Sequence, residues 1–316
     1  MEFFPATNDT PAYYVWSPVN SPKLIVQISH GMTEHAGRYK EFGEFLASKG
    51  ILVIAHDHPG HGQTVATKEQ LGHIDDHDGW PLILQGINRI RGVVKERYPD
   101  IPIVLLGHSM GSFAARGIMA QAESEYIGLI ISGTAWFSNS KIFFGKLGTR
   151  LLCSLFGSAK KMKITSKLSF KQFNKQVKER TTPFDWLTRD TVKVKEYSLD
   201  PLCAYRSSNG FFRDLLNGIE LAHSKASLCL SDKNLPILII SGDKDPVGEG
   251  GKGPDRLYKM YQKEGMTNLT LKLYKGARHE LLNEINRVEV MEFLYRWLNE
   301  QIINKITYTT VIGSFI

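Results

Sequence analysis

Six runs of apolar and β-branched residues recur along the chain, and stretches with helical spacing of apolar positions lie between or after most of them. Short buried strands that alternate with amphipathic helices predict an α/β fold with a doubly wound, mostly parallel sheet. The predicted strands are Lys23–Ser29, Ile51–Ala55, Ile103–Leu106, Ile127–Ser132, Pro236–Ser241 and Leu269–Tyr274, with Tyr13–Trp16 as an antiparallel edge strand. The predicted helices are Arg38–Lys49, Trp80–Arg97, Ser109–Gln121, Asp255–Glu264 and Val288–Asn299.

This alternation stops after Gly133 and resumes at Pro236. Residues 137–229 are irregularly helical in pattern, with Phe, Leu and Lys interleaved. Ligands of open α/β sheets bind beyond the carboxyl ends of the strands, so an insertion between two core strands predicts a lid over that edge. We predict core segments 1–136 and 230–316 with an inserted helical cap at 137–229. The tail, 306–316, is β-branched and poorly charged, and its pattern assigns it no role.

Positive charge is concentrated in the predicted cap. The net charge is +7, but residues 141–180 alone hold eleven Lys/Arg and one Asp/Glu, which leaves 28 Lys/Arg and 31 Asp/Glu elsewhere. No nucleic-acid-binding motif accompanies the basic segment, so we expect no nucleic-acid partner. From Lys141 to Phe156 large apolar residues stand beside the cations, and Lys160–Lys163 follows. The mixture is equally typical of an element that dips into an anionic lipid surface and of a cap helix packed on the core.

The length of 316 residues suits one large domain or a core with an insertion. Cys153, Cys203 and Cys229 are an odd number without metal-type spacing, which indicates free thiols in a reducing compartment. The first residues resemble no signal peptide, and no apolar run approaches the roughly 20 residues that span a bilayer. We expect a cytoplasmic protein, with peripheral membrane association left open, and the sequence carries no signal for an oligomeric state.

The strongest chemical signal is the run Gly107-His-Ser-Met-Gly111, which directly follows a predicted strand and precedes a predicted helix. Gly-x-Ser-x-Gly in that position is typical of a nucleophile elbow. Its turn is so tight that Ser109 must adopt a strained backbone conformation, and the two flanking glycines lack the Cβ atoms that would clash. Ser109 is therefore the predicted nucleophile, and an ordinary Gly-rich turn is the alternative.

A serine hydroxyl needs a base to take its proton and an acid to orient that base. In hydrolases built on such an elbow, the acid and then the histidine follow the serine along the chain. Of the two downstream histidines, His223 lies inside the insertion, whereas His279 follows the last predicted strand and is the predicted base. Asp243 and Asp245 both follow the preceding strand. We prefer Asp245, because Pro246 holds it away from helical geometry, and we expect Asp243 to cap the turn.

The oxyanion of an acyl-transfer reaction needs two backbone N–H donors. One is expected from Met110, the residue after the nucleophile. The other is expected from Met32, in the loop after the first parallel strand, where Gly31 permits a close turn.

Five histidines that lie close in sequence raise the question of a metal ion. They are His30, His35, His56, His58 and His61, and His56-x-His58 could act as a chelate. No Asp, Glu or Cys pattern completes a recognised zinc site, and a Ser-His-Asp hydrolase needs no metal. We expect no metal and no cofactor, and we expect these histidines to be buried hydrogen-bonding groups that shape the oxyanion loop.

Three motifs together resemble those of monoacylglycerol lipases and their bacterial lysophospholipase-like relatives, from about Tyr13 to Leu298. Two segments, Asp185–Asp190 and Asp200–Cys203, are similar to the cap of the bacterial branch. Ser112 stands where this family usually has glycine. The three motifs are His30-Gly-Met-Thr-Glu-His-Ala-Gly-Arg-Tyr39, His56-Asp-His-Pro-Gly-His-Gly-Gln63 and Gly107-His-Ser-Met-Gly111.

The resemblance implies an α/β-hydrolase fold with a helical cap, a Ser109–Asp245–His279 triad, and Met32 and Met110 as oxyanion donors. It implies hydrolysis of fatty acyl monoesters of glycerol or of phospholipids through an acyl-enzyme. The substrate would be bound by cap residues of segment 137–229. A general short-chain carboxylesterase and a serine aminopeptidase of the same fold are the alternatives. An aminopeptidase needs an acidic anchor for the substrate amine, which a basic cap disfavours, although Asp185 and Asp190 leave that activity open.

Overall fold

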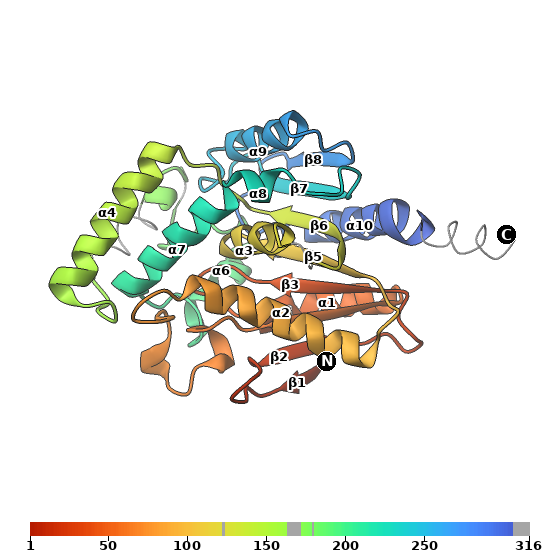
Figure 1. Cartoon of the computed structure of the whole chain (residues 1–316), viewed down its shortest axis with the longest axis horizontal. Helices are drawn as coiled ribbons and strands as arrows, with labels where there is room; N and C mark the ends of the chain where they lie inside the picture. The colour runs from red at the N-terminus through yellow and green to blue at the C-terminus, as the bar shows by residue number, and fades with distance from the viewer. Residues whose placement is uncertain (122–123, 163–171, 179, 306–316) are drawn as a thin grey trace, which may run out of the picture.

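In the computed structural model, which describes residues 1–121, 124–162, 172–178 and 180–305, eight strands form one sheet (Figure 1). Their order across the sheet is β1-β2-β4-β3-β5-β6-β7-β8. The pairs β1–β2 and β2–β4 are antiparallel, and every other pair is parallel. The strands are β1 Glu2–Phe4, β2 Tyr13–Trp16, β3 Leu24–Ser29, β4 Ile51–His56, β5 Ile103–His108, β6 Tyr126–Ser132, β7 Ile237–Gly242 and β8 Leu269–Tyr274.

The predicted α/β class and all six predicted parallel strands are confirmed, with ends displaced by no more than two residues. The antiparallel strand β2 is also confirmed, but its predicted place at the edge is wrong. β1 pairs with its outer side, and Phe4 stacks on Tyr13 with 4.5 Å between ring centroids. A strand of three residues has no alternation long enough to stand out in the sequence, so β1 could not be predicted from its pattern.

Helices cover both faces of the sheet because alternate strand residues point to opposite sides. Ile25, Leu52 and Leu105 pack on one side against α2, α3 and α9, and Val26 and Val53 pack on the other side against α1 and α10. The covering helices are α1 Lys40–Ser48, α2 Trp80–Arg97, α3 Met110–Met119, α9 Lys252–Lys263 and α10 Arg287–Leu298. Short 3₁₀ turns lie at η1 Ala36–Tyr39, η2 Gly62–Thr64, η3 Lys68–Gln70 and η4 Leu281–Asn283, and a π-turn spans Asn299–Ile303.

The described part of the chain between β6 and β7 contains helices and no strand, and α4 and α7 lie beyond one end of the sheet (Figure 1). α4 packs along α7, and α7 in turn contacts α3 and α2 of the core. The contact with α2 is close, since a Cβ added to Gly218 would overlap the ring of Trp80. The helices whose bounds lie within the described residues of this segment are α4 Asn139–Phe156, α6 Thr191–Leu199, α7 Asn209–Ala222 and α8 Lys225–Leu228.

The three cysteines are free thiols, as the odd number predicted. Within the described ranges, the helices are all too short or too polar to cross a membrane. The tail 306–316, to which no role was assigned from its pattern, lies outside the described residues.

Candidate active site

Ser109 occupies the turn between β5 and α3 with φ +52° and ψ −117°, a conformation that non-glycine residues rarely adopt. The predicted strain is therefore present. A Cβ on Gly107 would overlap the carbonyl group of Gly111, and a Cβ on Gly111 would overlap that of Ser29. Both glycines of the motif are required by space, which brings the start of α3 against the end of β3.

Ser112, which departs from the family pattern, stabilises the elbow through hydrogen bonds of its side chain. Its hydroxyl lies 2.6 Å from the Ser109 carbonyl oxygen and 2.9 Å from Thr134 Oγ1, and the side chain is fully buried. Because Thr134 follows β6, this serine ties the first turn of α3 to the neighbouring strand end.

The predicted base and acid are in contact. His279 Nδ1 lies 2.9 Å from Asp245 Oδ2, and Asp245 is fully buried, with its other oxygen accepting the Val247 N–H at 2.9 Å. Burial alone would lower the pKa of His279, but the carboxylates of Asp245, Glu280 and Glu34, with Asp245 contributing most, together outweigh burial and raise it. Asp243 instead accepts the Gly276 N–H at 2.7 Å, so it caps the turn as expected.

A cavity of about 630 Å³ brings together the residues predicted from the sequence, since Ser109, His279, Met32 and Met110 all line it. A volume of this size is typical of sites for small molecules. Side chains from the segment between β6 and β7 form much of its remaining wall, and that wall is mainly apolar. These lining residues include Phe137, Phe144, Leu152, Phe173, Trp186, Phe212, Leu215, Leu216 and Ile219.

The loop that carries Met32 is held at both neighbouring residues. On one side, the Gly31 N–H donates to Glu34 Oε1 at 2.6 Å, and a Cβ on Gly31 would come within 3.2 Å of the Ser109 Cβ. On the other side, Thr33 has φ +56°, and its carbonyl oxygen accepts from the Tyr197 hydroxyl at 3.1 Å. Glycine at position 31 thus permits a close approach to the nucleophile.

Four of the five clustered histidines are fully buried, as expected: His30, His56, His58 and His61. The expected hydrogen bonding is wrong for His56, whose two ring nitrogens have no partner among the described residues. The backbone N–H of His58 donates to His30 Nε2 at 3.0 Å, and the His30 Nδ1 lies 2.7 Å from the Gly31 carbonyl oxygen. Burial lowers the pKa of all four, to about 3 for His56 and about 4 for His61, so they are neutral near pH 7.

The fifth histidine faces the segment between β6 and β7. His35 Nε2 lies 2.9 Å from Asp200 Oδ2, and in the described part of the chain the group with metal-like spacing is His35, Asp200 and Cys203, whose ligand atoms lie within 4.8 Å of one another. Burial raises the pKa of the Cys203 thiol, which opposes the thiolate that a metal needs. The existing hydrogen bond accounts for the cluster as a contact between the core and this segment.

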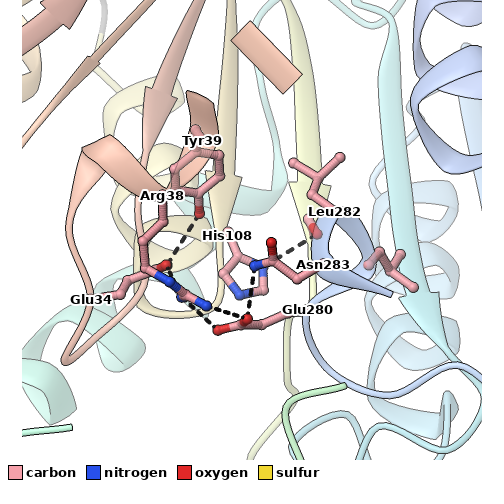
Figure 2. A pocket seen from close by; sticks show the side chains of 9 residues that line it. Glu34, Arg38, Tyr39, His108, Glu280, Leu282 and Asn283 are labelled. Atoms are coloured by element: carbon pink, nitrogen blue, oxygen red, sulfur yellow. Dashed lines mark hydrogen bonds and ion pairs between the residues drawn. The ribbon is translucent and has the colours of Figure 1, made fainter. Parts of the chain in front are cut away.

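An arginine between two glutamates is a feature that the sequence did not predict (Figure 2). Arg38 donates to Glu34 Oε2 at 2.6 Å and to both Glu280 oxygens at 2.7 and 2.6 Å. Tyr39 also donates to Glu34, and the three charged groups border a small cavity of about 20 Å³ beside His108. Glu280 directly follows His279 in sequence, which was the one signal available, but nothing in the sequence pairs positions 38 and 280.

The chain matches the family model described as Serine aminopeptidase, S33 (Hydrolase_4) over residues 20–286. Monoglyceride lipase of Rattus norvegicus is 30% identical over 294 residues, which cover 91% of this chain and 86% of that protein. Phospholipase YtpA of Bacillus subtilis is 25% identical over 288 residues, which cover 88% of this chain and 96% of that protein. The structure of a highly thermostable carboxyl esterase from Bacillus coagulans in complex with glycerol superimposes with a TM-score of 0.86 at 27% identity, covering 96% and 98%. With an elbow serine, a buried Asp–His pair and this agreement along most of its length, the chain belongs to the serine aminopeptidase S33 (Hydrolase_4) family of α/β hydrolases.

Proposed function

We propose that the protein is a serine hydrolase that cleaves carboxylic esters of fatty acids, with monoacylglycerols or lysophospholipids as substrates. The observation that carries the proposal is one largely apolar cavity of about 630 Å³ that is lined by both the strained Ser109 and the Asp245-bonded His279. The apolar wall suits an acyl chain. Relatives named monoglyceride lipase, phospholipase and carboxyl esterase support ester chemistry.

The reaction proceeds as two acyl transfers. His279 takes the hydroxyl proton of Ser109 while the serine oxygen attacks the ester carbonyl, and the N–H groups of Met32 and Met110 stabilise the oxyanion. Collapse breaks the bond to the alcohol, which leaves with the proton from His279. Water then gives a proton to His279 and attacks the acyl-enzyme. As the bond between the acyl carbon and the Ser109 oxygen breaks, His279 returns that proton to the serine and the fatty acid is released. Asp245 orients the imidazole and stabilises its charged form.

Peptide substrates with a free amine fit less well, because the acidic side chains near the cavity already have partners. Glu249, at the cavity wall, pairs with Lys141 at 3.6 Å and with Arg256 at 2.9 Å. Asp185 accepts the N–H groups of Thr181 and Thr182. An acidic anchor for an amine would have to give up one of these bonds, which disfavours the aminopeptidase alternative.

Hydrolysis of a substrate panel tests the proposal. The panel contains p-nitrophenyl esters of increasing chain length, monoacylglycerols, lysophospholipids and an aminoacyl p-nitroanilide. We expect turnover of the lipid esters by the wild type and loss of turnover in Ser109→Ala. Turnover of short soluble esters alone would identify a general carboxylesterase instead, and full activity in Ser109→Ala would refute the role of the serine.

We further propose that residues 137–229 act as a cap over the cavity and that α4 is its contact with lipid. Phe143, Leu147, Leu151 and Leu155 recur at four-residue intervals along α4 and are 57–64% exposed. A helix that packed this stripe on the core would bury it, so the exposure favours the lipid-facing interpretation of the basic cap. Arg150 within α4 and Lys160, four residues after its end, are exposed and would add attraction to anionic headgroups.

Co-sedimentation with anionic phospholipid vesicles tests this contact. The double variant Leu147→Glu/Leu151→Glu should lose vesicle binding, because both positions belong to the exposed stripe. Neither side chain lines the cavity, so the substitutions leave the cavity wall unchanged. Ile285→Glu/Val288→Glu, at similarly exposed positions near the start of α10, is the matched control and should bind like the wild type. Arg150→Glu/Lys160→Glu should weaken binding most at low salt. Equal binding by Leu147→Glu/Leu151→Glu and the wild type would contradict the proposal.

A further inference from the structure

Arg38 lies where two loops of the proposed catalytic machinery meet. Its guanidinium group donates to Glu34 at 2.6 Å and to both oxygens of Glu280, in the two-pronged geometry that fixes a carboxylate most firmly (Figure 2). Glu34 belongs to the loop of the proposed oxyanion donor Met32, and Glu280 is the residue after the proposed base, His279. These side chains are 5–11% exposed, so water screens the three charges little.

Arg38 contacts two of the side chains that hold the loop of Met32. Glu34 holds the Gly31 N–H at 2.6 Å, and Arg38 holds Glu34. Tyr197 holds the Thr33 carbonyl oxygen, and the Arg38 guanidinium lies over the Tyr197 ring at 4.8 Å from its centroid. Both residues that flank Met32 therefore have a backbone group bonded to a side chain that Arg38 itself contacts.

Glu280, the second carboxylate bound by Arg38, lies directly beside the proposed base in the sequence. Glu280 is held by its two bonds to Arg38, by Asn283 Nδ2 at 2.9 Å, and by its own N–H, which donates to the Leu187 carbonyl oxygen at 2.7 Å. Because Glu280 directly follows His279, a shift of Glu280 would move the imidazole relative to Ser109.

The charges of the three groups support each other. Burial disfavours ionisation of Glu34, but the Arg38 guanidinium holds the pKa of that carboxyl below its usual range. Burial likewise acts against the charge on Arg38, and Glu280 and Glu34 raise its pKa well above the usual value. Breaking either pair would leave a buried charge without its partner, so the arrangement has a strong preference for one geometry.

We propose that Arg38 is a positioning residue that joins the loop of Met32 to the loop of His279 through Glu34 and Glu280. The inference rests on the proposed serine-hydrolase function, since it assigns a task in that reaction to a residue outside the lining of the main cavity. In this arrangement, the oxyanion donor and the base keep their separation only while both carboxylates are bound to the same guanidinium group.

Arg38→Lys keeps the charge but cannot bridge two carboxylates in the same geometry. Its kcat per active site, counted by stoichiometric labelling with a fluorophosphonate, should fall by at least about tenfold, with KM within about twofold. Arg287→Lys is the matched control, because Arg287 also joins two carboxylates, Glu41 and Asp190. Neither of these lines the main cavity, whereas Glu34 and Glu280 both do. This control should keep kcat within about twofold, and equal kcat in the two variants would overturn the proposal.

A double-mutant cycle covers the case in which Arg38→Lys does not fold. Glu34→Gln and Glu280→Gln preserve shape, and each should slow labelling by the fluorophosphonate, whose phosphoryl oxygen occupies the oxyanion site. If one arginine joins the two loops, the double variant should lose less than the product of the two single losses. Strictly multiplicative losses would mean that the loops act independently, and the proposal would fail.

The labelling rate is measured without a substrate, so the serine-hydrolase function and the positioning role of Arg38 can be tested separately. A wild-type chain that resists the fluorophosphonate would contradict the serine-hydrolase function itself. A wild type that reacts, with Glu34→Gln and Glu280→Gln reacting at the same rate, would contradict only the role of Arg38.

Discussion

At the scale of single residues, Asp243 and Asp245 stand two positions apart and serve different turns. Asp243 accepts the Gly276 N–H, whereas Asp245 lies against the His279 imidazole. The proline that follows Asp245 was sufficient to favour it from the sequence. The Arg38–Glu280 pair could not be found in the same way, because only the folded sheet brings together two loops that lie 242 residues apart.

Replacing each aspartate by asparagine should separate their roles. Asp245→Asn removes the charge that stabilises the imidazolium and permits the wrong tautomer, so kcat should fall by about 10²–10⁴-fold. Asp243→Asn loses one hydrogen bond in a turn and should keep kcat within a few fold, with about 1 kcal/mol lost from the free energy of unfolding. Ester hydrolysis and urea unfolding measure the two effects. Equal kcat in the two variants would remove Asp245 from the triad.

The pH dependence should follow the charge next to His279. The imidazole acts as a base only when neutral, so activity is lost as the pH falls through its pKa. Asp245 raises that pKa above the ordinary value of 6.5. The acid limb of kcat/KM should therefore lie above pH 6.5 in the wild type, and the residual activity of Asp245→Asn should show a limb at lower pH. A limb that does not move in this variant would contradict the assignment.

At the scale of elements, the buried strands were predictable because each is a continuous apolar run, and the covering helices because each has one apolar face. The helices between β6 and β7 were predictable only as a class. Their limits depend on contacts that are distant in sequence, such as the packing of α7 on α2 through Gly218 and Trp80. The alternation of polar and apolar positions carries no information about a contact of this kind.

Gly218→Ala should therefore weaken the contact between α7 and α2. The added methyl group would overlap Trp80, and crowding of this kind costs about 1–3 kcal/mol of unfolding free energy. Gly92→Ala is the control, since a Cβ at Gly92 meets nothing within 4 Å, and it should add up to about 1 kcal/mol through helix propensity. Urea unfolding compares the two, and equal stability would show that α7 is free to move away from α2.

At the scale of the whole molecule, the segment between β6 and β7 shares the core of the sheet domain. Ile142, Phe211, Phe212 and Ile219 belong to the same apolar cluster as residues of β5 and α2. A second, small cluster is formed by five buried residues of this segment, and Val247 of the core packs against it. The five are Val177, Trp186, Leu187, Tyr197 and Cys203. The predicted boundaries at 137 and 229 mark where the pattern of apolar residues changes. That pattern does not show which residues of the segment are buried together with residues of the core.

We expect the chain to unfold in one cooperative step for this reason. Urea transitions followed by far-ultraviolet circular dichroism and by tryptophan fluorescence should coincide. Trp186 lies in the small cluster and Trp80 in the shared one, so the fluorescence signal samples both parts. A fluorescence transition that precedes the loss of helix would indicate that segment 137–229 unfolds on its own.

The backbone of Ser109, at φ +52°, sets activity and durability against each other. A conformation of this kind costs a serine about 1–3 kcal/mol, and glycine adopts it freely. Ser109→Gly should consequently melt at a higher temperature than Ser109→Ala, although neither can form an acyl-enzyme. Thermal unfolding of the two inactive chains isolates the backbone contribution, and equal melting temperatures would mean that the turn is relaxed. The nucleophilic serine thus lowers the thermal stability of the active protein relative to the inactive Ser109→Gly variant.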